Sequence, residues 1–403
     1  MLSMDPIERD DTTLILARQA RLREVMRAND VPALLTADPI NIAYACGARN
    51  MTVFSMMGPS RFVLVFAEGP TILFEFPGCE HLVDHLATVN EVRPAPGITP
   101  TSGPDYAAAA QRFAAEIAAD CRRHLDASPV LGVERVDFTF TDALRAGGID
   151  LRDATAVFSA ARVIKLDVEI AAIRAAVVHV EDAVHDLERS IHCGATEVEV
   201  WASFHRALIA GDGEYVSTRL FQSGPNTFPY FREAGSRRIG AGELVCLDTD
   251  AIGQRGYAVD FSRTFRSDDT VPTPRQRELY ALAFEQLQHN ASLLRAGRSF
   301  EDVARRAWPV PERHQPWGYY CLGHGLGLCG EHPYLPHARH GEPYGLRGDL
   351  AAGMVICIES YIGDAAAGEG VKLEDQYLVT DTGAERLTTY PFDPVLGPGL
   401  EAR

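Results

Sequence analysis

Carboxylates follow apolar strands in the second half of the chain, and this pattern constrains the fold most. The apolar run 244–247 leads directly into Asp248 and Asp250, and the alternation of side chains along a strand predicts that both point the same way. A glycine-containing turn follows, and a second strand returns with Asp260. Three converging carboxylates are costly to bury without cations. Oxygen ligands suit divalent metals, so we predict a metal site, with a solvated turn as the alternative.

Three further residues extend this prediction. His324 stands between two glycines, which leave the imidazole room to reach a metal, although a structural histidine fits the same pattern. Glu359 ends the apolar run 354–358, an expensive place for a charge unless it is bound or paired. Glu374 joins the set, although Lys372 could simply pair with it. The predicted metal ligands are Asp248, Asp250, Asp260, His324, Glu359 and Glu374.

Charge and composition narrow the class of protein. The chain has 403 residues, a length that suits two domains. Its 38 basic and 55 acidic residues give a formal charge of −17, which repels nucleic acids and anionic membranes, so neither is an expected partner. The acidic start MLSMDPIERDD does not resemble a signal peptide, and no uncharged apolar stretch reaches about 18 residues. Eight scattered cysteines without a CxxC pair favour reduced thiols and a cytoplasmic protein.

The order of helix and strand patterns predicts two domains. Residues 1–158 alternate strands with helices, which is typical of a small α/β domain. Residues 159–403 combine helices with a largely antiparallel sheet, so this part is α+β. The expected helices lie at 14–29, 105–125, 166–190, 197–209 and 274–296. The expected strands lie at 33–36, 61–76 (a hairpin), 129–133, 243–250, 258–264, 354–361 and 371–380, with a loop at 92–104.

In this order and at these spacings, the motifs resemble those of the creatinase, prolidase and methionine aminopeptidase family. The family has an aspartate strand, a GYxxDxxRT-like segment, a GHGxG histidine, a glutamate after an apolar strand and a final LED-like motif. Here these supply Asp248, Asp260, His324, Glu359 and Glu374. The resemblance implies a pita-bread catalytic domain over 159–403, a creatinase-type domain over 1–158, and two divalent metal ions (Fe, Mn, Zn or Co).

The chain departs from the peptidases of this family at three positions. Those enzymes usually have glycine where Asp250 stands, and histidines where Tyr230 and Glu331 stand. One branch, the dimethylsulfoniopropionate (DMSP) lyases, resembles this chain in the extra aspartate, an aromatic residue at 230, Tyr319 and a KLEDQ-like motif at 372–376. The resemblance implies iron as the metal and a C–S lyase that forms dimethyl sulfide and acrylate from DMSP or a similar onium carboxylate.

Aromatic residues near the metal motifs fit this branch. A sulfonium or quaternary ammonium group favours aromatic faces, although core packing is the commoner role for any single ring. Metals would clamp the substrate carboxylate while a base removes the acidified α proton. The lyases' proposed base is an Asp where Gly330 stands here, so Glu331 and Tyr319 are the candidate catalytic residues. The predicted substrate-binding residues are Phe228, Tyr230, Phe231, Trp317 and Tyr320.

Two other functions remain open from the sequence. A metal-dependent hydrolase, such as an Xaa-Pro dipeptidase or a hydrolase of small amides and amidines, fits the ligands but lacks the peptidase histidines. A non-catalytic binding module fits the fold but would not need all six ligands. The expected partner in each case is a small molecule. Family members are commonly homodimers, and the segment 50–57 is a candidate for the loop that reaches the partner subunit.

Overall fold

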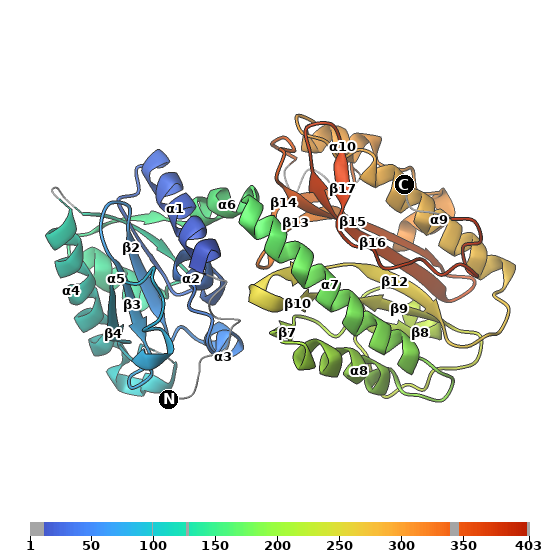
Figure 1. Cartoon of the computed structure of the whole chain (residues 1–403), viewed down its shortest axis with the longest axis horizontal. Helices are drawn as coiled ribbons and strands as arrows, with labels where there is room; N and C mark the ends of the chain where they lie inside the picture. The colour runs from blue at the N-terminus through green and yellow to red at the C-terminus, as the bar shows by residue number, and fades with distance from the viewer. Residues whose placement is uncertain (1–11, 99, 126–128, 339–345, 401–403) are drawn as a thin grey trace. The chain divides into compact units, whose positions relative to one another are not determined.

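The computed structural model describes residues 12–98, 100–125, 129–338 and 346–400 (Figure 1). The chain divides into two compact units, Met1–Arg162 and Val163–Arg403. The helix α6 (Thr155–Val163) runs across the boundary expected after residue 158, so the division falls at the end of this helix instead. The N-terminal segment predicted not to be a signal peptide lies outside the described residues.

The first unit contains one six-stranded sheet in the order β4-β3-β2-β1-β5-β6. The expected hairpin at 61–76 is formed by the antiparallel pair β2 and β3. The segment expected as a loop at 92–104 instead contributes to β4, which pairs parallel with β3. The strands are β1 (Ala33–Thr36), β2 (Phe62–Phe66), β3 (Thr71–Glu75), β4 (Glu91–Pro94), β5 (Val130–Glu134) and β6 (Asp150–Asp153).

Helices cover this sheet. Phe113 of α4 packs against Phe62 and Phe74 of the sheet, with ring centroids 5.1 Å and 4.8 Å apart. The helix α2 starts where the Asp38 side chain accepts hydrogen bonds from two backbone N–H groups, a cap that stabilises a helix start. With α6, the helices are α1 (Thr12–Ala28), α2 (Pro39–Cys46), α3 (Thr52–Met57), α4 (Tyr106–His124) and α5 (Phe138–Ala146).

The second unit has helices outside three antiparallel sheets, as an α+β domain should. The sheets run β11-β10-β7, β12-β9-β8 and β14-β13-β15-β16-β17. Figure 1 shows α7 (Asp167–Ser190) and α8 (Glu197–Ala210) beside the first two sheets, and α9 (Pro274–Ala291) and α10 (Phe300–Arg306) beside the third. The short strands are β7 (Tyr215–Val216), β8 (Phe221–Ser223), β9 (Leu244–Asp248), β10 (Ala251–Ile252), β11 (Ala258–Val259), β12 (Ser262–Arg266) and β17 (Ala384–Arg386).

The five-stranded sheet separates an apolar core from a polar face. Its remaining strands are β13 (Cys321–Leu326), β14 (Gly330–Pro336), β15 (Val355–Asp364) and β16 (Glu369–Val379). Ile356, Ile358 and Leu373 point to the core that includes Leu279 of α9. Because side chains alternate along a strand, the residues next to these in sequence lie on the opposite face. Glu359 and Glu374 are two of them.

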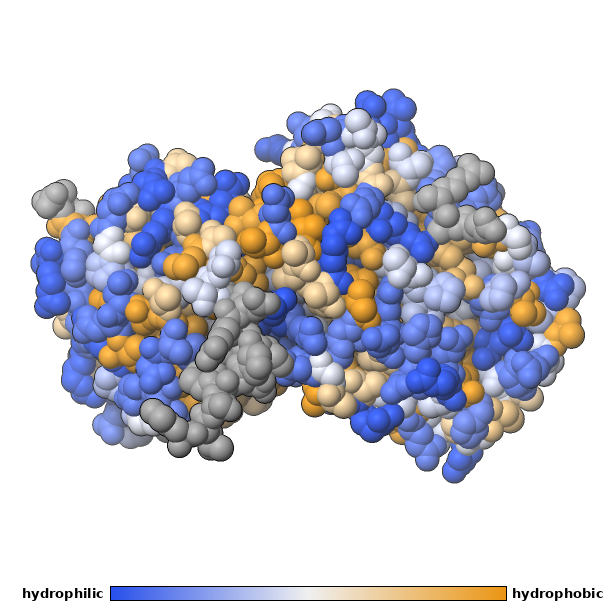
Figure 2. All heavy atoms as spheres, viewed as in Figure 1, coloured by the Kyte–Doolittle hydropathy of each residue, from blue (hydrophilic) through white to orange (hydrophobic). Residues whose placement is uncertain are grey.

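The surface of the second unit mixes hydrophilic and hydrophobic residues. On the face that Figure 2 shows, the two kinds are interspersed over this unit. Among the described helices, none combines the length and the apolar character that crossing a membrane requires.

Candidate metal centre

Two buried glutamates face each other across neighbouring strands. Glu359 of β15 and Glu374 of β16 are directly opposite in the antiparallel ladder, and they are 4% and 0% exposed. Like charges directly opposite one another destabilise a sheet. Glu374 Oε1 is also buried without a hydrogen-bond partner among the described residues. Lys372 Nζ lies 2.6 Å from Glu359 Oε2 and 2.7 Å from Glu374 Oε2, so the alternative pairing of Glu374 with Lys372 is present in the structure. A further cation beside the Oε1 atoms would satisfy the oxygens that face away from the lysine, so the pair also fits a metal site.

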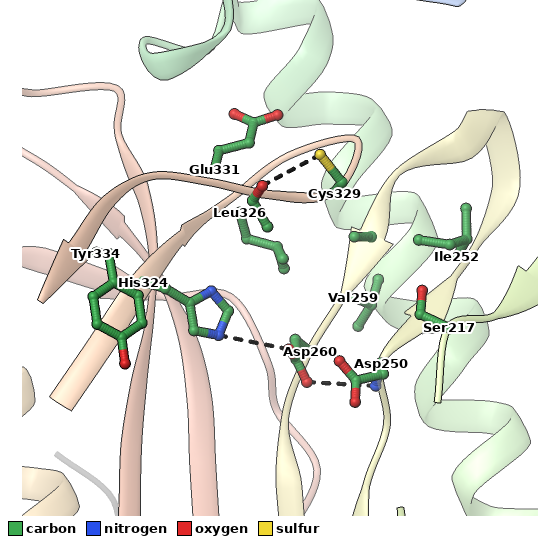
Figure 3. A pocket seen from close by; sticks show the side chains of 12 residues that line it. Ser217, Asp250, Ile252, Val259, Asp260, His324, Leu326, Cys329, Glu331 and Tyr334 are labelled. Atoms are coloured by element: carbon green, nitrogen blue, oxygen red, sulfur yellow. Dashed lines mark hydrogen bonds and ion pairs between the residues drawn. The ribbon is translucent and has the colours of Figure 1, made fainter. Parts of the chain in front are cut away.

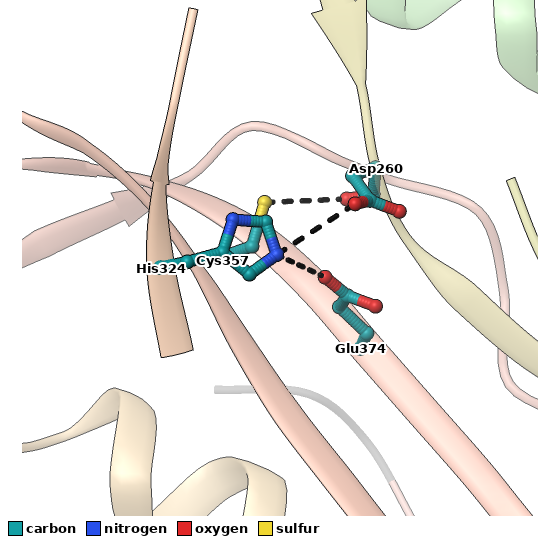
Figure 4. A group of neighbouring side chains, drawn as sticks. All are labelled: Asp260, His324, Cys357 and Glu374. Carbon is teal, nitrogen blue, oxygen red and sulfur yellow. Dashed lines mark hydrogen bonds and ion pairs between the residues drawn. The ribbon is translucent and has the colours of Figure 1, made fainter. Parts of the chain in front are cut away.

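His324 of β13 lies beside these glutamates. Its Nε2 is 3.4 Å from Glu359 Oε1, 3.7 Å from Glu374 Oε1 and 3.7 Å from Asp260 Oδ2. Figure 4 shows His324, Asp260 and Glu374 grouped with Cys357, and one ligand atom from each of the four lies within 4.8 Å of the others. One nitrogen and several carboxylate oxygens form a donor set that suits borderline divalent metals.

Cys357 is a member of this group that the sequence suggested only as one of eight reduced thiols. It pairs with His324 across β13 and β15, and it lies two residues before Glu359 on the same strand. Residues two apart on a strand share a face. That spacing was the available signal, because the strand expected at 354–361 contains both residues.

Asp248 ends β9 and is surrounded by donors. It accepts hydrogen bonds from the Tyr230 hydroxyl and from Ser262 Oγ, the latter at 2.7 Å, and Lys372 Nζ lies 3.3 Å from Oδ2. Burial alone would raise the pKa of Asp248, but the Lys372 ammonium and the two hydroxyl donors lower this pKa to about 2. Asp248 is therefore held as a carboxylate, the form that binds a metal.

Asp250 reaches the cluster by a different route from the one expected. The strand β9 stops at Asp248, and Asp250 has a left-handed φ of 40°, so strand alternation does not set its direction. Its Oδ2 accepts a 2.5 Å hydrogen bond from Thr218, and its backbone N–H donates to Asp260 Oδ1 at 3.4 Å. Burial and the charge of Asp248 raise the pKa of Asp250 to about 6, so a nearby cation favours its ionised form.

Asp260 sits at a break that the sequence did not predict. The expected strand 258–264 is two strands, because β11 pairs with β10 whereas β12 pairs with β9. Asp260 lies between them and is 6% exposed. Burial, followed by the charge of Glu374, raises the pKa of Asp260 well above its usual range. The structure thus brings the six predicted ligands together in an arrangement that needs added positive charge.

A pocket of about 440 Å³ opens onto this cluster (Figure 3). Asp250, Asp260 and His324 line one part of it, and Ile252, Val259 and other apolar residues line another. Such a volume suits a small molecule. The full lining is Ser217, Asp250, Ile252, Ala258, Val259, Asp260, His324, Leu326, Cys329, Gly330, Glu331 and Tyr334.

The predicted substrate-binding aromatics form a connected group of rings. Tyr230 has its ring centroid 4.9 Å from Phe231 and 5.3 Å from Tyr319, and Tyr319 lies 5.0 Å from Tyr320. Phe228 and Trp317 pair separately at 5.4 Å. Three of these side chains are exposed and therefore not core residues: Phe231 (53%), Trp317 (48%) and Tyr320 (42%).

The two candidate catalytic residues lie in different surroundings. Glu331 lines the pocket, but Figure 3 shows its carboxylate directed away from Asp260 and His324. Lys165 Nζ lies 2.8 Å from Glu331 Oε2, and the Leu328 N–H donates to Oε1 at 3.1 Å. The structure therefore does not bring the Glu331 carboxylate to the metal cluster, because neighbouring residues on β14 point to opposite faces.

Tyr319, in contrast, packs on Tyr230, which hydrogen-bonds a predicted metal ligand. Burial, followed by the charge of Glu359, raises the pKa of Tyr319 above its usual range. Lys372 Nζ lies 5.9 Å from the Tyr319 ring centroid and acts in the opposite direction, but burial dominates, so Tyr319 is a neutral phenol. Positive charge beside Glu359 would offset the second of these two causes.

Comparison with known proteins adds to this geometry. The model of metallopeptidase family M24 matches residues 171–381. Dimethylsulfoniopropionate lyase DddP from Roseovarius nubinhibens is 33% identical over 94% of this chain and 86% of its own. An Xaa-Pro dipeptidase from Pyrococcus furiosus is 29% identical over 56% of this chain and 63% of its own.

Solved structures show the same fold. The prolidase from Pyrococcus horikoshii OT3 superposes with a TM-score of 0.73 at 22% identity, covering 94% of this chain and 99% of its own. The predicted α+β pita-bread fold is thereby confirmed. The chain belongs to metallopeptidase family M24, a family of metal-dependent enzymes.

Proposed function

We propose that this enzyme is a dinuclear metal-dependent lyase that cleaves DMSP, or a similar onium carboxylate, to dimethyl sulfide and acrylate. The observation that carries the proposal is the group of aromatic rings beside the carboxylates, in which Tyr230 contacts both Asp248 and Tyr319. Aromatic faces attract onium groups. The 33% identity to a lyase over nearly the whole chain supports the same choice.

The six clustered residues would hold the metals. Asp260, His324, Glu359 and Glu374 surround one position, and Asp248 and Asp250 extend the donor set from the other side of Asp260. We favour iron, with manganese, zinc or cobalt as alternatives. When bound, two such cations supply Lewis acidity toward a substrate carboxylate.

Aromatic residues of the protein would bind the substrate's sulfonium group and remove its proton. The rings of Tyr230, Phe231 and Tyr319 would hold the sulfonium group, and Tyr319, once ionised to its phenolate with the metals bound, would take the proton from the carbon next to the substrate carboxylate. The electron pair of that C–H bond forms the new C=C bond, and the pair of the C–S bond leaves with sulfur. The products are acrylate, dimethyl sulfide and one proton.

Headspace measurement of dimethyl sulfide tests this proposal. Purified protein loaded with Fe²⁺ or Mn²⁺ should release dimethyl sulfide from DMSP, and Asp260→Ala should not. Tyr319→Phe should keep its metals and lose activity by at least about 100-fold, the usual contribution of a general base. A wild type with two bound metals and no release would exclude the lyase.

A hydrolase is the second candidate, because relatives and solved neighbours include Xaa-Pro dipeptidases and prolidases and Gly330 lacks the carboxylate expected of the lyases. Release of proline from Gly-Pro or Ala-Pro by the Mn²⁺- or Co²⁺-loaded protein would favour it. A catalytic role for Glu331 predicts loss of this activity in Glu331→Ala.

We also propose that the enzyme is a homodimer. Apolar side chains of the segment 50–57 are exposed in the first unit, and exposed apolar groups of this kind mark contact surfaces. They are Met51 (45%), Val53 (50%), Phe54 (55%) and Met57 (75%).

A further inference from the structure

A buried histidine anchors the segment that ends in Trp317. His314 lies in the 3-10 helix η6 (Glu312–Trp317) and is 1% exposed. Its Nδ1 donates a 2.7 Å hydrogen bond to the Gly363 carbonyl of β15, and its Nε2 accepts one from Arg313 Nε at 2.9 Å. A carbonyl can only accept, and an arginine N–H can only donate. Both ring nitrogens are therefore used by a neutral imidazole with its proton on Nδ1.

Gly363 connects this histidine to the predicted substrate-binding rings. A Cβ at this glycine would lie 2.7 Å from Phe228 Cδ2, so a side chain there would displace the Phe228 ring. Phe228 in turn packs edge-on against Trp317, with ring centroids 5.4 Å apart. The helix η6 is thus tied to one residue of β15 at two points, directly by His314 and through Phe228 by Trp317.

Charged groups around His314 oppose a second proton on its ring. Burial is the main cause that lowers the pKa of His314, and Arg313 and Arg275 of α9 lower it further, although the backbone hydrogen bond and Glu278 of α9 act in the opposite direction. Glu278 pairs with both arginines, and Asp364 of β15 pairs with Arg275. A proton on Nε2 would face the N–H of Arg313 and break that hydrogen bond.

We propose that His314 is a positioning residue for substrate binding, which as a neutral imidazole holds η6 on β15 and so keeps Trp317 packed against Phe228. His314 does not touch the substrate itself. The part played by the two rings, attraction of an onium group, rests on the proposed function, whereas the anchoring of η6 does not.

Acid should release this anchor. Once η6 leaves β15, His314 regains the pKa of a free histidine, about 6.5, which is above its pKa in the anchored state. The released state therefore binds the proton more tightly. Its population should rise by up to about tenfold for each pH unit below about 6.5, until the pH reaches the lowered pKa of the anchored histidine.

Tryptophan fluorescence tests the anchor without measuring activity. The chain has three tryptophans, so each protein is compared with the same protein carrying Trp317→Phe, and the difference is the emission of Trp317. Spectra of metal-loaded wild type, His314→Gln and His289→Gln are recorded from about pH 8 to about pH 5, where histidine titrates. His289 is the matched control, because it also bonds a backbone carbonyl, at 2.8 Å, but is exposed and lies outside this network.

In the wild type and in His289→Gln, the Trp317 emission should shift to longer wavelength as the pH falls below about 6.5, because the ring leaves Phe228 and meets more water. His314→Gln should show no such shift, since its amide has a donor and an acceptor but does not titrate in this range. Loss of metal in acid would affect all three proteins alike. A wild type without the shift, or an equal shift in His314→Gln, would overturn the inference.

A second variant covers the case in which His314→Gln does not fold. Arg313 has an exposed side chain (55%), and Arg313→Met removes the N–H and the positive charge that face His314 Nε2. Protonation of His314 is then opposed less, so the Trp317 shift should move to higher pH. A midpoint equal to that of the wild type would overturn the inference.

Kinetics with DMSP separate this inference from the proposed function. As the pH falls below about 6.5, the KM of the wild type should rise relative to that of His314→Gln, by up to about tenfold for each pH unit, while the ratio of their kcat values stays constant. Equal KM values at every pH would overturn the link between His314 and substrate binding. A Trp317 shift without any release of dimethyl sulfide would instead exclude the lyase and leave His314 as the anchor of η6.

Discussion

At the scale of single residues, the cluster depends on donors that keep buried acids ionised. Asp248 has its pKa lowered to about 2, whereas burial and the charge of Asp248 raise that of Asp250 to about 6. Asp248 differs because Lys372, Tyr230 and Ser262 all donate to it or offset its charge. These neighbours therefore hold Asp248 in the ionised form that binds a metal.

Tyr230→Phe tests this conclusion. The lowered pKa of Asp248 keeps it charged until the pH falls close to that pKa, so removal of the hydroxyl donor should raise the pKa. A hydrogen bond to a charged group contributes about 1.5–3 kcal/mol, or about 1–2 pH units. We expect metal release on acidification to shift by that amount to higher pH.

Tyr361→Phe is the matched control, because the Tyr361 hydroxyl donates to the Thr227 carbonyl and not to a carboxylate. Its metal release, followed by a colorimetric chelator, should follow the wild-type curve. Identical curves for all three proteins would show that Tyr230 does not support Asp248.

Gly330 marks the position where the DMSP lyases have an aspartate. A Cβ built there has no neighbour within 4 Å, and Gly330 is exposed in the pocket wall, so a side chain fits. We expect Gly330→Asp to raise the rate of dimethyl sulfide release at least about tenfold, because a carboxylate is already a base at neutral pH. Gly330→Ala should leave the rate unchanged. If Gly330→Asp folds and binds metal but releases dimethyl sulfide no faster than the wild type, the result would argue against a lyase active site in this pocket.

At the scale of elements, burial and family motifs carried most of the site prediction. Glu359 was predicted from the apolar run before it, and Glu374 was supported by the LED-like motif, and the long strands β15 and β16 place both on one face. Asp250 and Asp260 could not be placed in this way, since a left-handed residue and a change of sheet partner interrupt their strands. Sequence patterns do not reveal which strands pair. For the same reason, the position of Cys357 opposite His324 could not be predicted.

The hairpin of β13 and β14 shows a structural role for a residue predicted to be catalytic. Glu331 and Lys165 form a buried pair with side chains 6% and 1% exposed. Breaking a buried pair by removing one charge costs about 3–5 kcal/mol. We expect Glu331→Gln to lower the free energy of unfolding in urea by that amount, and to change kcat of the metal-loaded enzyme less than tenfold.

Glu301→Gln controls for loss of an ordinary ion pair. Glu301 pairs with Arg305 at 2.7 Å, but both side chains are exposed, so its loss should cost no more than about 1 kcal/mol. Loss of activity by about 100-fold or more in Glu331→Gln, without loss of stability, would instead support the catalytic role.

At the scale of the whole molecule, the sequence predicted both units and the fold class, because the family motifs and the helix periods extend over long segments. The division between the units fell later than expected because α6 continues through it. The sequence could not decide between lyase and hydrolase, because that choice depends on the directions of a few side chains in the pocket. Glu331 is an example, since its carboxylate points away from Asp260 and His324.

The homodimer is a prediction at this scale. Light scattering should give twice the chain mass of 44.0 kDa, and replacing Phe54 and Met57 with serine and glutamate should give the mass of one chain. Phe138→Ser is the matched control, because Phe138 is also exposed in the first unit, at 77%, but lies outside 50–57. A monomeric wild type would refute the prediction.

Anomalous diffraction from crystals of the manganese- or iron-loaded protein would show whether the six residues hold two metal ions. We expect two anomalous peaks, one within coordination distance of Asp260, His324, Glu359 and Glu374, and a second one near Asp248, Asp250 and Asp260. A metal-loaded crystal with no peak among these residues, or with its peaks elsewhere in the chain, would contradict this expectation.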